Sequence, residues 1–189
     1  MITIQDAEKI VKETLSEKRY FHSVCVMKRC EEYAKMLGAN VEDAKLIGIL
    51  HDIAKEMPKE EKVKYCEENG IEIDEVEREH ITLLHGKIAA HISKHQYGLN
   101  DELADAIKYH TTGRKDMTVL DKILYVADTT GEDRHYDNTE FFYKLSKEDF
   151  DKALIEILKF TIKDRLNENK LVHMQSIEAY NDLVFKFNK

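Results

Sequence analysis

Hydrophobic residues recur at the three- and four-residue spacing of amphipathic helices along almost the whole chain. Between these runs stand residues that typically begin or end helices, namely Thr3, Asn40 and Asn100 at starts and Gly38 and Gly98 at ends. No segment shows the sustained alternation of polar and apolar residues that a half-buried strand would have. The pattern therefore predicts an all-α fold, a single-domain helical bundle.

The apolar periodicity and the caps together define the expected elements. We expect helices over about 3–16, 19–37, 40–57, 58–70, 86–96, 100–110, one that begins at Thr118, and two more over 146–166 and 176–187. The stretches 129–143 and 167–175 lack a clear period, and we expect loops or pocket rims there. We interpret residues 1–189 as one domain, with the candidate chemistry in about 19–134 and C-terminal helices over about 146–187.

Composition narrows the classes of function. A formal charge of −8, with no long basic stripe, argues against a nucleic-acid partner, although local cations could still bind a small anionic substrate. The apolar runs are too short for a membrane span, and the charged N-terminus does not resemble a signal peptide. Three cysteines without a C-x-x-C pair suit a reducing compartment, so we expect a cytoplasmic protein. A homodimer is left open.

One apolar run is interrupted by two polar residues, His51 and Asp52, between Leu50 and Ile53. A carboxylate buried there without a partner would cost several kcal/mol or more, so it should be protonated, paired or bound to a metal. Imidazole nitrogens and carboxylate oxygens are ligands for the same cations. The pair therefore predicts a metal site, for which other segments must supply further ligands.

Further candidate ligands occur at or near the ends of other predicted helices. They are His22, His85, His110 and Asp128, each flanked by apolar residues that would turn it inward. Helices packed around a core can bring such groups to one point. The spacing alone does not establish that they meet.

Several strings around these residues resemble those of the HD-domain phosphohydrolases, and together they resemble YqeK-type HD proteins, which hydrolyse diadenosine tetraphosphate symmetrically to two ADP. The strings are Arg19-Tyr20-Phe21-His22-Ser23, His51-Asp52-Ile53-Ala54-Lys55, Leu84-His85-Gly86, Tyr109-His110-Thr111-Thr112-Gly113-Arg114, and Tyr125-Val126-Ala127-Asp128 followed by Arg134. The resemblance covers nearly the whole chain. It departs after Asp128, where Thr129-Thr130-Gly131-Glu132-Asp133 replaces a Tyr-Ile-Glu-Pro-like stretch, and at Ala89, where a glycine is common.

The resemblance implies a dinuclear metal centre and a role for each ligand. His22, His51, Asp52 and Asp128 would hold one metal, and Asp52 would bridge to a second metal held by His85 and His110. It also favours iron, while manganese, cobalt and zinc suit the same nitrogen and oxygen ligands. A metal-bound hydroxide would then attack a phosphorus of the nucleotide substrate.

Nearby cations and hydrogen-bond donors are candidates for holding the substrate phosphates. Lys55 follows His51 by four residues, which on a helix would bring its ammonium to the metals. The predicted phosphate-binding residues are Lys55, Thr111, Gly113, Arg114 and Arg134, and the predicted catalytic residues are Asp52, Lys55, Arg114 and Arg134.

The remaining histidines have ordinary interpretations. His91 and His95 have the spacing of a helical zinc pair but no acidic partner nearby, so we expect them, with His80, His135 and His173, at the surface or a rim. Three alternative functions stay open. They are another phosphatase or phosphodiesterase activity on the same centre, a non-catalytic metal- or nucleotide-binding module, and a diiron oxygenase.

Overall fold

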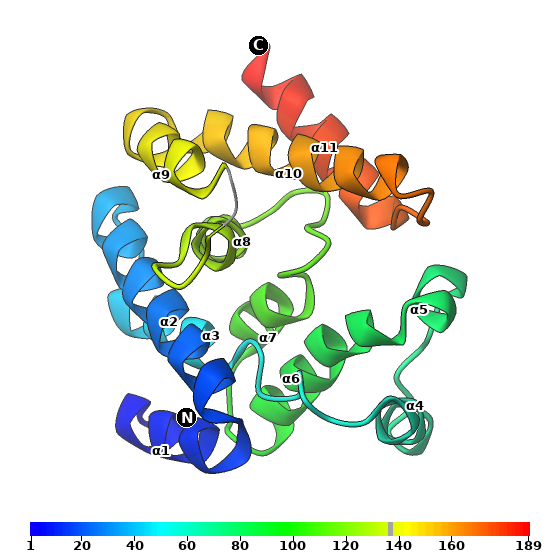
Figure 1. Ribbon diagram of the computed structural model, residues 1–189. Coiled ribbons are helices and arrows are strands. Elements are labelled where there is room, and N and C mark those ends of the chain that lie inside the picture. The colour runs from blue at the N-terminus through cyan, green and yellow to red at the C-terminus, as the bar shows by residue number, and fades with distance from the viewer. Residues whose placement is uncertain (136–137) are drawn as a thin grey trace.

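The structure, a computed structural model, describes residues 1–135 and 138–189. Within these residues it contains eleven α-helices, one short 3-10 helix and no strand (Figure 1). The prediction of an all-α fold is confirmed. Residues 136–137, part of the stretch 129–143 that we expected to be irregular, lie outside the described residues.

The helices follow one another with short connections. They are α1 (Ile4–Thr14), α2 (Glu17–Leu37), α3 (Val41–Leu50), α4 (Lys59–Glu68), α5 (Glu75–Glu79), the 3-10 helix η1 (Ile81–Leu83), α6 (Leu84–His95), α7 (Asp101–Lys108), α8 (Val119–Thr130), α9 (Thr139–Glu148), α10 (Phe150–Asn167) and α11 (Met174–Phe187).

The predicted caps form as expected. The side chains of Thr3, Asn40 and Asn100 each accept a hydrogen bond from a backbone N–H in the first turn of their helix. Thr118 and Asp121 form a reciprocal capping box at the start of α8. Gly38 ends α2 with φ of 71°, a left-handed conformation that glycine adopts without steric cost.

Two predicted helices have different boundaries. The helix expected over 146–166 is divided, because Asp149 is extended with φ of −151° and its side chain accepts from the backbone N–H of Lys152. The helix α9 that precedes this break begins inside the stretch expected to be irregular. The helix expected over 40–57 ends at Leu50, and successive turns with backbone bonds from residue i+3 to residue i follow it. His51 and Asp52 therefore lie just beyond a helix end.

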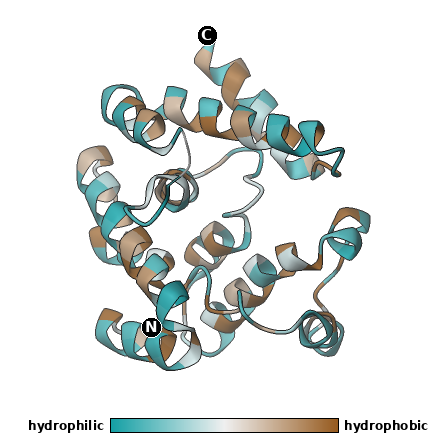
Figure 2. Cartoon of the chain, in the orientation of Figure 1, coloured by the Kyte–Doolittle hydropathy of each residue, from teal (hydrophilic) through white to brown (hydrophobic). Residues whose placement is uncertain are grey.

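Helix α2 packs most extensively on α3 and also against α8, so these three helices form one closely packed group. The close approach of α2 and α3 depends on Gly48, because a Cβ at this position would lie only 2.7 Å from the Cα of Met27. The helices carry both hydrophobic and hydrophilic residues, as expected of amphipathic helices (Figure 2). The buried apolar side chains form one continuous core.

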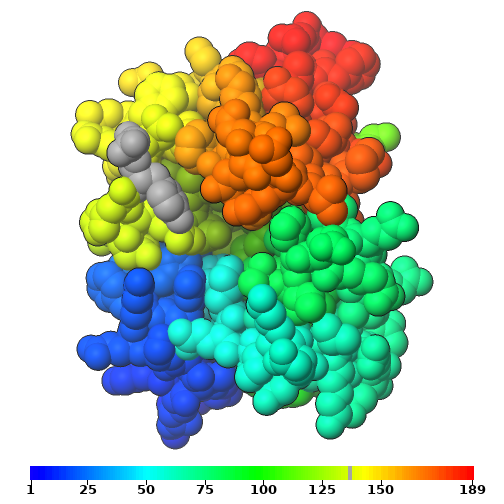
Figure 3. Space-filling view, turned by 45° about the vertical axis from the view of Figure 1, so that its right-hand side comes forward, coloured from blue at the N-terminus to red at the C-terminus, as the bar shows by residue number. Residues whose placement is uncertain are grey.

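The C-terminal helices α9, α10 and α11 lie together at one end of the molecule, above α8 in Figure 1, and the N-terminal helices lie at the other end in the space-filling view (Figure 3). Among the described residues, none of the helices combines the length and the hydrophobicity needed to cross a bilayer.

Candidate metal centre

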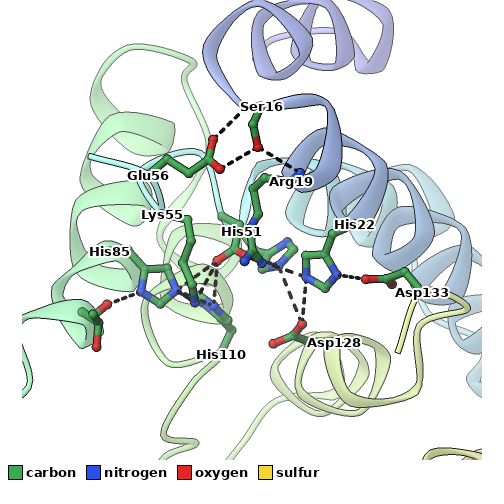
Figure 4. A network of polar contacts seen from close by, with 12 residues as sticks. Ser16, Arg19, His22, His51, Lys55, Glu56, His85, His110, Asp128 and Asp133 are labelled. Carbon is green, nitrogen blue, oxygen red and sulfur yellow. Dashed lines mark hydrogen bonds and ion pairs between the residues drawn. The ribbon is translucent and has the colours of Figure 1, made fainter. Parts of the chain in front are cut away.

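Six side chains predicted as metal ligands meet between five helices, in the arrangement shown in Figure 4. His22 projects from α2 and Asp128 from α8, while His85 is in the first turn of α6 and His110 follows the end of α7. His51 and Asp52 come from the turn after α3. The structure therefore brings together segments that are distant along the chain.

Asp52 lies between two groups of imidazoles. Its Oδ1 lies 3.0 Å from His85 Nε2 and 3.7 Å from His110 Nε2. Its Oδ2 lies 3.5 Å from His51 Nε2 and 3.8 Å from His22 Nε2. Because each carboxylate oxygen faces a different pair of imidazoles, Asp52 could contact two cations at once.

The second carboxylate, that of Asp128, contacts imidazoles on one side of the centre only. Asp128 Oδ1 lies 3.0 Å from His22 Nε2 and 4.0 Å from His51 Nε2. One ligand atom from each of these three residues lies within 4.8 Å of the others, close enough to hold a single metal ion. The same holds for His51, Asp52 and His110 on the other side. We call the part of the centre that contains His22 and Asp128 the His22 side, and the part that contains His85 and His110 the His85 side. His51 and Asp52 lie between the two sides.

In each histidine of the centre, Nδ1 points away from the centre and Nε2 points into it. The partner of this outer nitrogen, Nδ1, determines which of the two nitrogens carries the hydrogen. The Nδ1 atoms of His51, His85 and His110 lie within hydrogen-bond distance of the backbone carbonyls of Gly48, Thr82 and Ile107. A carbonyl only accepts, so in these three rings Nδ1 carries the hydrogen. Each Nε2 therefore presents a lone pair to the centre.

Lone pairs that face one another in a buried site repel unless a cation lies between them. His85 Nε2 and His110 Nε2 are only 3.1 Å apart, and within the described residues the buried atoms His51 Nε2 and Asp52 Oδ1 have no hydrogen-bond partner. Protonation does not relieve this, because burial lowers the pKa of His51 to about 3 and that of His85 to about 4. The donor set of imidazole nitrogens and carboxylate oxygens fits a transition metal.

The two carboxylates stay ionised at neutral pH. Burial alone would raise the pKa of Asp52, but the neighbouring imidazoles of His51, His110 and His85 hold it well below its usual range. Burial also opposes the ionised form of Asp128, and the contacts with His22 and Arg134 again keep its pKa well below the usual range. Both side chains are therefore available as anionic ligands.

Three basic side chains surround the centre. Arg19 donates to Asp52 Oδ2 at 2.8 Å, and the ammonium of Lys55 lies 3.2 Å from His85 Nε2 and 3.6 Å from Asp52 Oδ1. Arg134 pairs with the carboxylate of Asp128. Sequence reasoning did not assign Arg19 a role, although its spacing of three residues from His22 on α2 puts both on one helix face.

Two predicted phosphate-binding residues are placed differently. The guanidinium of Arg114 is held by Asp121 and Asp105, each at 2.8 Å, and no described contact links it to the centre. Gly113 has φ of 69°, and a Cβ there would lie 3.1 Å from the Cβ of Ala179, so this glycine is needed for a turn packed against α11. The predicted phosphate contacts of both residues stay predictions.

Thr111 directly follows the ligand His110 and lines a small cavity of about 50 Å³, together with Thr161 and Arg165. Its predicted role in phosphate binding stays a prediction. After His110 the chain turns toward the C-terminal helices, where Gly113 approaches Ala179 of α11.

The other histidines lie apart from the centre. His91 contacts the hydroxyl of Tyr65 at 2.9 Å and packs against His95. His173 is buried and pairs with Asp74 at 2.8 Å, which connects the loop before α11 to the start of α5. His173 therefore does not lie at the open surface, although it lines the same small cavity as Thr111.

Comparisons with known proteins agree with this geometry. The model of the HD domain family matches residues 19–133. The chain is 34% identical to the symmetrical bis(5'-nucleosyl)-tetraphosphatase of Bacillus subtilis, over 95% of this chain and 97% of that protein. It is 31% identical to the protein of the same name from Staphylococcus aureus, over 95% of this chain and 94% of that protein.

A solved structure is similar over the same length. It is described as a predicted HD superfamily hydrolase involved in NAD metabolism from Clostridium acetobutylicum. The two chains superpose with a TM-score of 0.93 at 32% identity, and the match covers 98% of this chain and 99% of the other. The arrangement of helices that gathers the six ligands is therefore shared with an experimentally determined fold.

Proposed function

The chain belongs to the HD-domain family, and from that premise we propose that it is a metal-dependent hydrolase that cleaves diadenosine tetraphosphate symmetrically to two ADP. The tetraphosphatases named above support the substrate, because they match almost the whole chain. The observation that carries the hydrolase proposal is the set of buried Nε2 lone pairs and carboxylate oxygens that face one another. A multiply charged cation would satisfy several of these groups at once.

The ligands divide between two metal ions as follows. His22, His51 and Asp128 would hold one ion, and His85 and His110 would hold the other, with Asp52 between them. We propose iron, with manganese, cobalt and zinc as ions that the same ligands accept. Bound metal would lower the pKa of water and stabilise negative charge on phosphate oxygens.

The basic residues around the centre are suited to hold the polyphosphate. Lys55 is about one-third exposed, so its ammonium can reach both the ligands and an incoming phosphate. Arg19 and Arg134 are also partly exposed and carry planar guanidinium groups that can pair with two phosphate oxygens. These three cations counter the negative charge of a substrate in a protein of net charge −8.

The scaffold residues contribute positioning rather than chemistry. Four hydrogen bonds to the outer nitrogens fix the imidazole rings before a substrate arrives. Such preorganisation avoids the cost of rearranging ligands and charges during the reaction. Cleavage between the second and third phosphates requires the substrate to be bound with its centre over Asp52.

Analysis of the products after incubation with metal-loaded protein tests the proposal. Symmetric cleavage of diadenosine tetraphosphate yields ADP as the sole nucleotide, and removal of metal with a chelator should abolish the reaction. AMP together with ATP, or release of free phosphate, would instead favour another phosphohydrolase activity. Bound metal without hydrolysis across a panel of nucleotides would favour a non-catalytic module.

A further inference from the structure

His22 differs from the other three histidines in what its outer nitrogen contacts. His51, His85 and His110 each use the backbone carbonyl three residues earlier in their own segment. His22 Nδ1 instead contacts the carboxylate of Asp133 at 2.8 Å, from a residue 111 positions further along the chain (Figure 4). One imidazole of the centre is thus oriented by a charged side chain.

The local backbone holds the Asp133 carboxylate in this place. Asp133 follows the end of α8 within a turn in which the Arg134 N–H donates to the Gly131 carbonyl at 3.0 Å. A Cβ at Gly131 would lie 2.8 Å from Asp133 Oδ1, so a side chain there would displace the carboxylate. The glycine at position 131 therefore lets the Asp133 carboxylate keep its present position.

The carboxylate has little other support. The Asp133 side chain is 17% exposed, and its Oδ1 is buried with no hydrogen-bond partner among the described residues. Burying a carboxylate with one partner is unfavourable unless that partner carries or gains positive charge. His22 gains positive character when its other nitrogen binds a cation, so the contact is strongest when the centre is occupied.

We propose that Asp133 is a positioning residue that orients His22 and strengthens it as a ligand, so that the His22 side binds metal more tightly than the His85 side. This inference rests on the metal centre of the proposed function. A carboxylate partner increases the electron density of an imidazole more than a neutral carbonyl does.

The charged side chains around the two sides also favour tighter metal binding on the His22 side. The His22 side has two carboxylates of its own, Asp128 and Asp133, which offset the guanidinium groups of Arg134 and Arg19. The His85 side has no carboxylate beyond the shared Asp52, and the ammonium of Lys55 lies 3.2 Å from its ligand nitrogen. A cation is therefore favoured more on the His22 side.

Titration of the metal-free protein with Mn²⁺, followed by calorimetry, tests the proposal directly. We expect two binding events in the wild-type protein. Asp133→Ala should weaken the tighter event by about 10- to 100-fold and leave the weaker event nearly unchanged. Asp133→Asn retains an acceptor for Nδ1 but not the charge, so its loss should be smaller.

Two further variants separate position from charge. Gly131→Ala keeps every charge and an allowed backbone conformation, with φ of −58°, but displaces the carboxylate, so it should weaken the same event. Glu132→Gln removes an exposed neighbouring charge and should leave both events unchanged. At low Mn²⁺ the Asp133→Ala protein should lose kcat with little change in KM, and excess Mn²⁺ should restore it.

Each possible result of these titrations supports or contradicts the proposed role of Asp133. Unchanged Mn²⁺ affinity in a folded Asp133→Ala protein, or an equal loss in Glu132→Gln, would overturn the role of Asp133 while leaving the metal centre intact. A loss confined to the weaker event would reverse the proposed order of the two sides. Absence of Mn²⁺ binding by the wild-type protein would overturn the proposed function together with this inference. Circular dichroism confirms that each variant is folded.

Discussion

The His22 side and the His85 side of the centre use the same kinds of ligand but hold them differently. On the His22 side the ligands come from α2 and α8, and the outer contact of the imidazole is a carboxylate. On the His85 side the ligands come from α6 and the end of α7, and the outer contacts are backbone carbonyls. One side thus depends on charged side chains and the other on local backbone geometry.

This difference affects how each side responds to mutation. A backbone carbonyl is present whatever the side chain, so the orientation of His85 and His110 is insensitive to substitution at Thr82 or Ile107. The orientation of His22 depends on one particular residue far along the chain. Ligands of equal chemistry can therefore differ in how easily evolution or mutagenesis changes them.

Loss of the shared carboxylate should have the largest effect, because Asp52 serves both sides. We expect Asp52→Asn to lower kcat by on the order of 1000-fold, since the amide is a weaker metal ligand and leaves the imidazoles without their common anion. Steady-state kinetics with metal in excess measures the loss. Activity within tenfold of wild type would show that the two sides do not act as one centre.

Removing one ligand from each side separates the two positions. His22→Ala and His85→Ala should each leave about one bound metal per chain, and kcat should fall on the order of 100-fold in both. Elemental analysis of the purified proteins gives the stoichiometry. Retention of two metals by both variants would contradict the division of the centre into two sides.

The basic residue of the His85 side should act mainly on the substrate. Lys55→Ala is expected to raise KM for the dinucleotide by about 10- to 100-fold, the magnitude of a lost hydrogen bond to a charged group. Arg114→Ala is the matched comparison, because Asp105 and Asp121 hold that guanidinium away from the centre. It should leave kcat/KM unchanged, and an equal loss in both variants would restore Arg114 to the site.

The pH dependence of stability should show buried neutral imidazoles on both sides. The pKa of His85 is about 4 and that of His51 about 3 when folded, both below the ordinary value of about 6.5. As pH falls below about 6.5 the unfolded chain binds protons that the folded chain does not. Metal-free protein should then lose about 1.4 kcal/mol of unfolding free energy per pH unit for each imidazole.

Urea unfolding at several pH values between 7 and 4 measures this loss. The contribution of His85 should level off near pH 4, where the folded protein also takes up the proton, whereas that of His51, with a pKa of about 3, should continue through this whole range. His85→Asn, which removes one of these imidazoles, should reduce the slope. A curve that is flat in wild type would contradict neutral imidazoles in the folded state.

The sequence predicted the helices and the convergence of the ligands better than the surroundings of the centre. Periodic apolar residues and caps such as Thr118 and Asp121 act locally, so they can be recognised without the fold. The contact between Asp133 and His22 joins segments 111 residues apart, and no local pattern encodes it. The contacts of Arg114 with Asp105 and Asp121 could not be predicted, because a loop arginine looks the same in sequence whether it meets a phosphate or two aspartates.

Boundaries were predicted less well where tertiary contacts decide them. Apolar residues continue through Leu50 and Ile53, so the period alone extends α3 across His51 and Asp52. The chain instead changes to tighter turns after Leu50, which alters the direction of Lys55 relative to the ligands. The break at Asp149 is similar, since its side chain caps a new helix within one continuous period.

The absence of a side chain at Gly48 has a consequence for the width of the centre. Its hydrogen faces the backbone of α2 at Met27, while its carbonyl oxygen accepts from the ring of His51. A methyl group there would wedge the two helices apart and shift the imidazoles of His22 and His51 away from each other. The distance between His22 and His51 is therefore set by Gly48, a residue without a side chain that lies about one helical turn before His51.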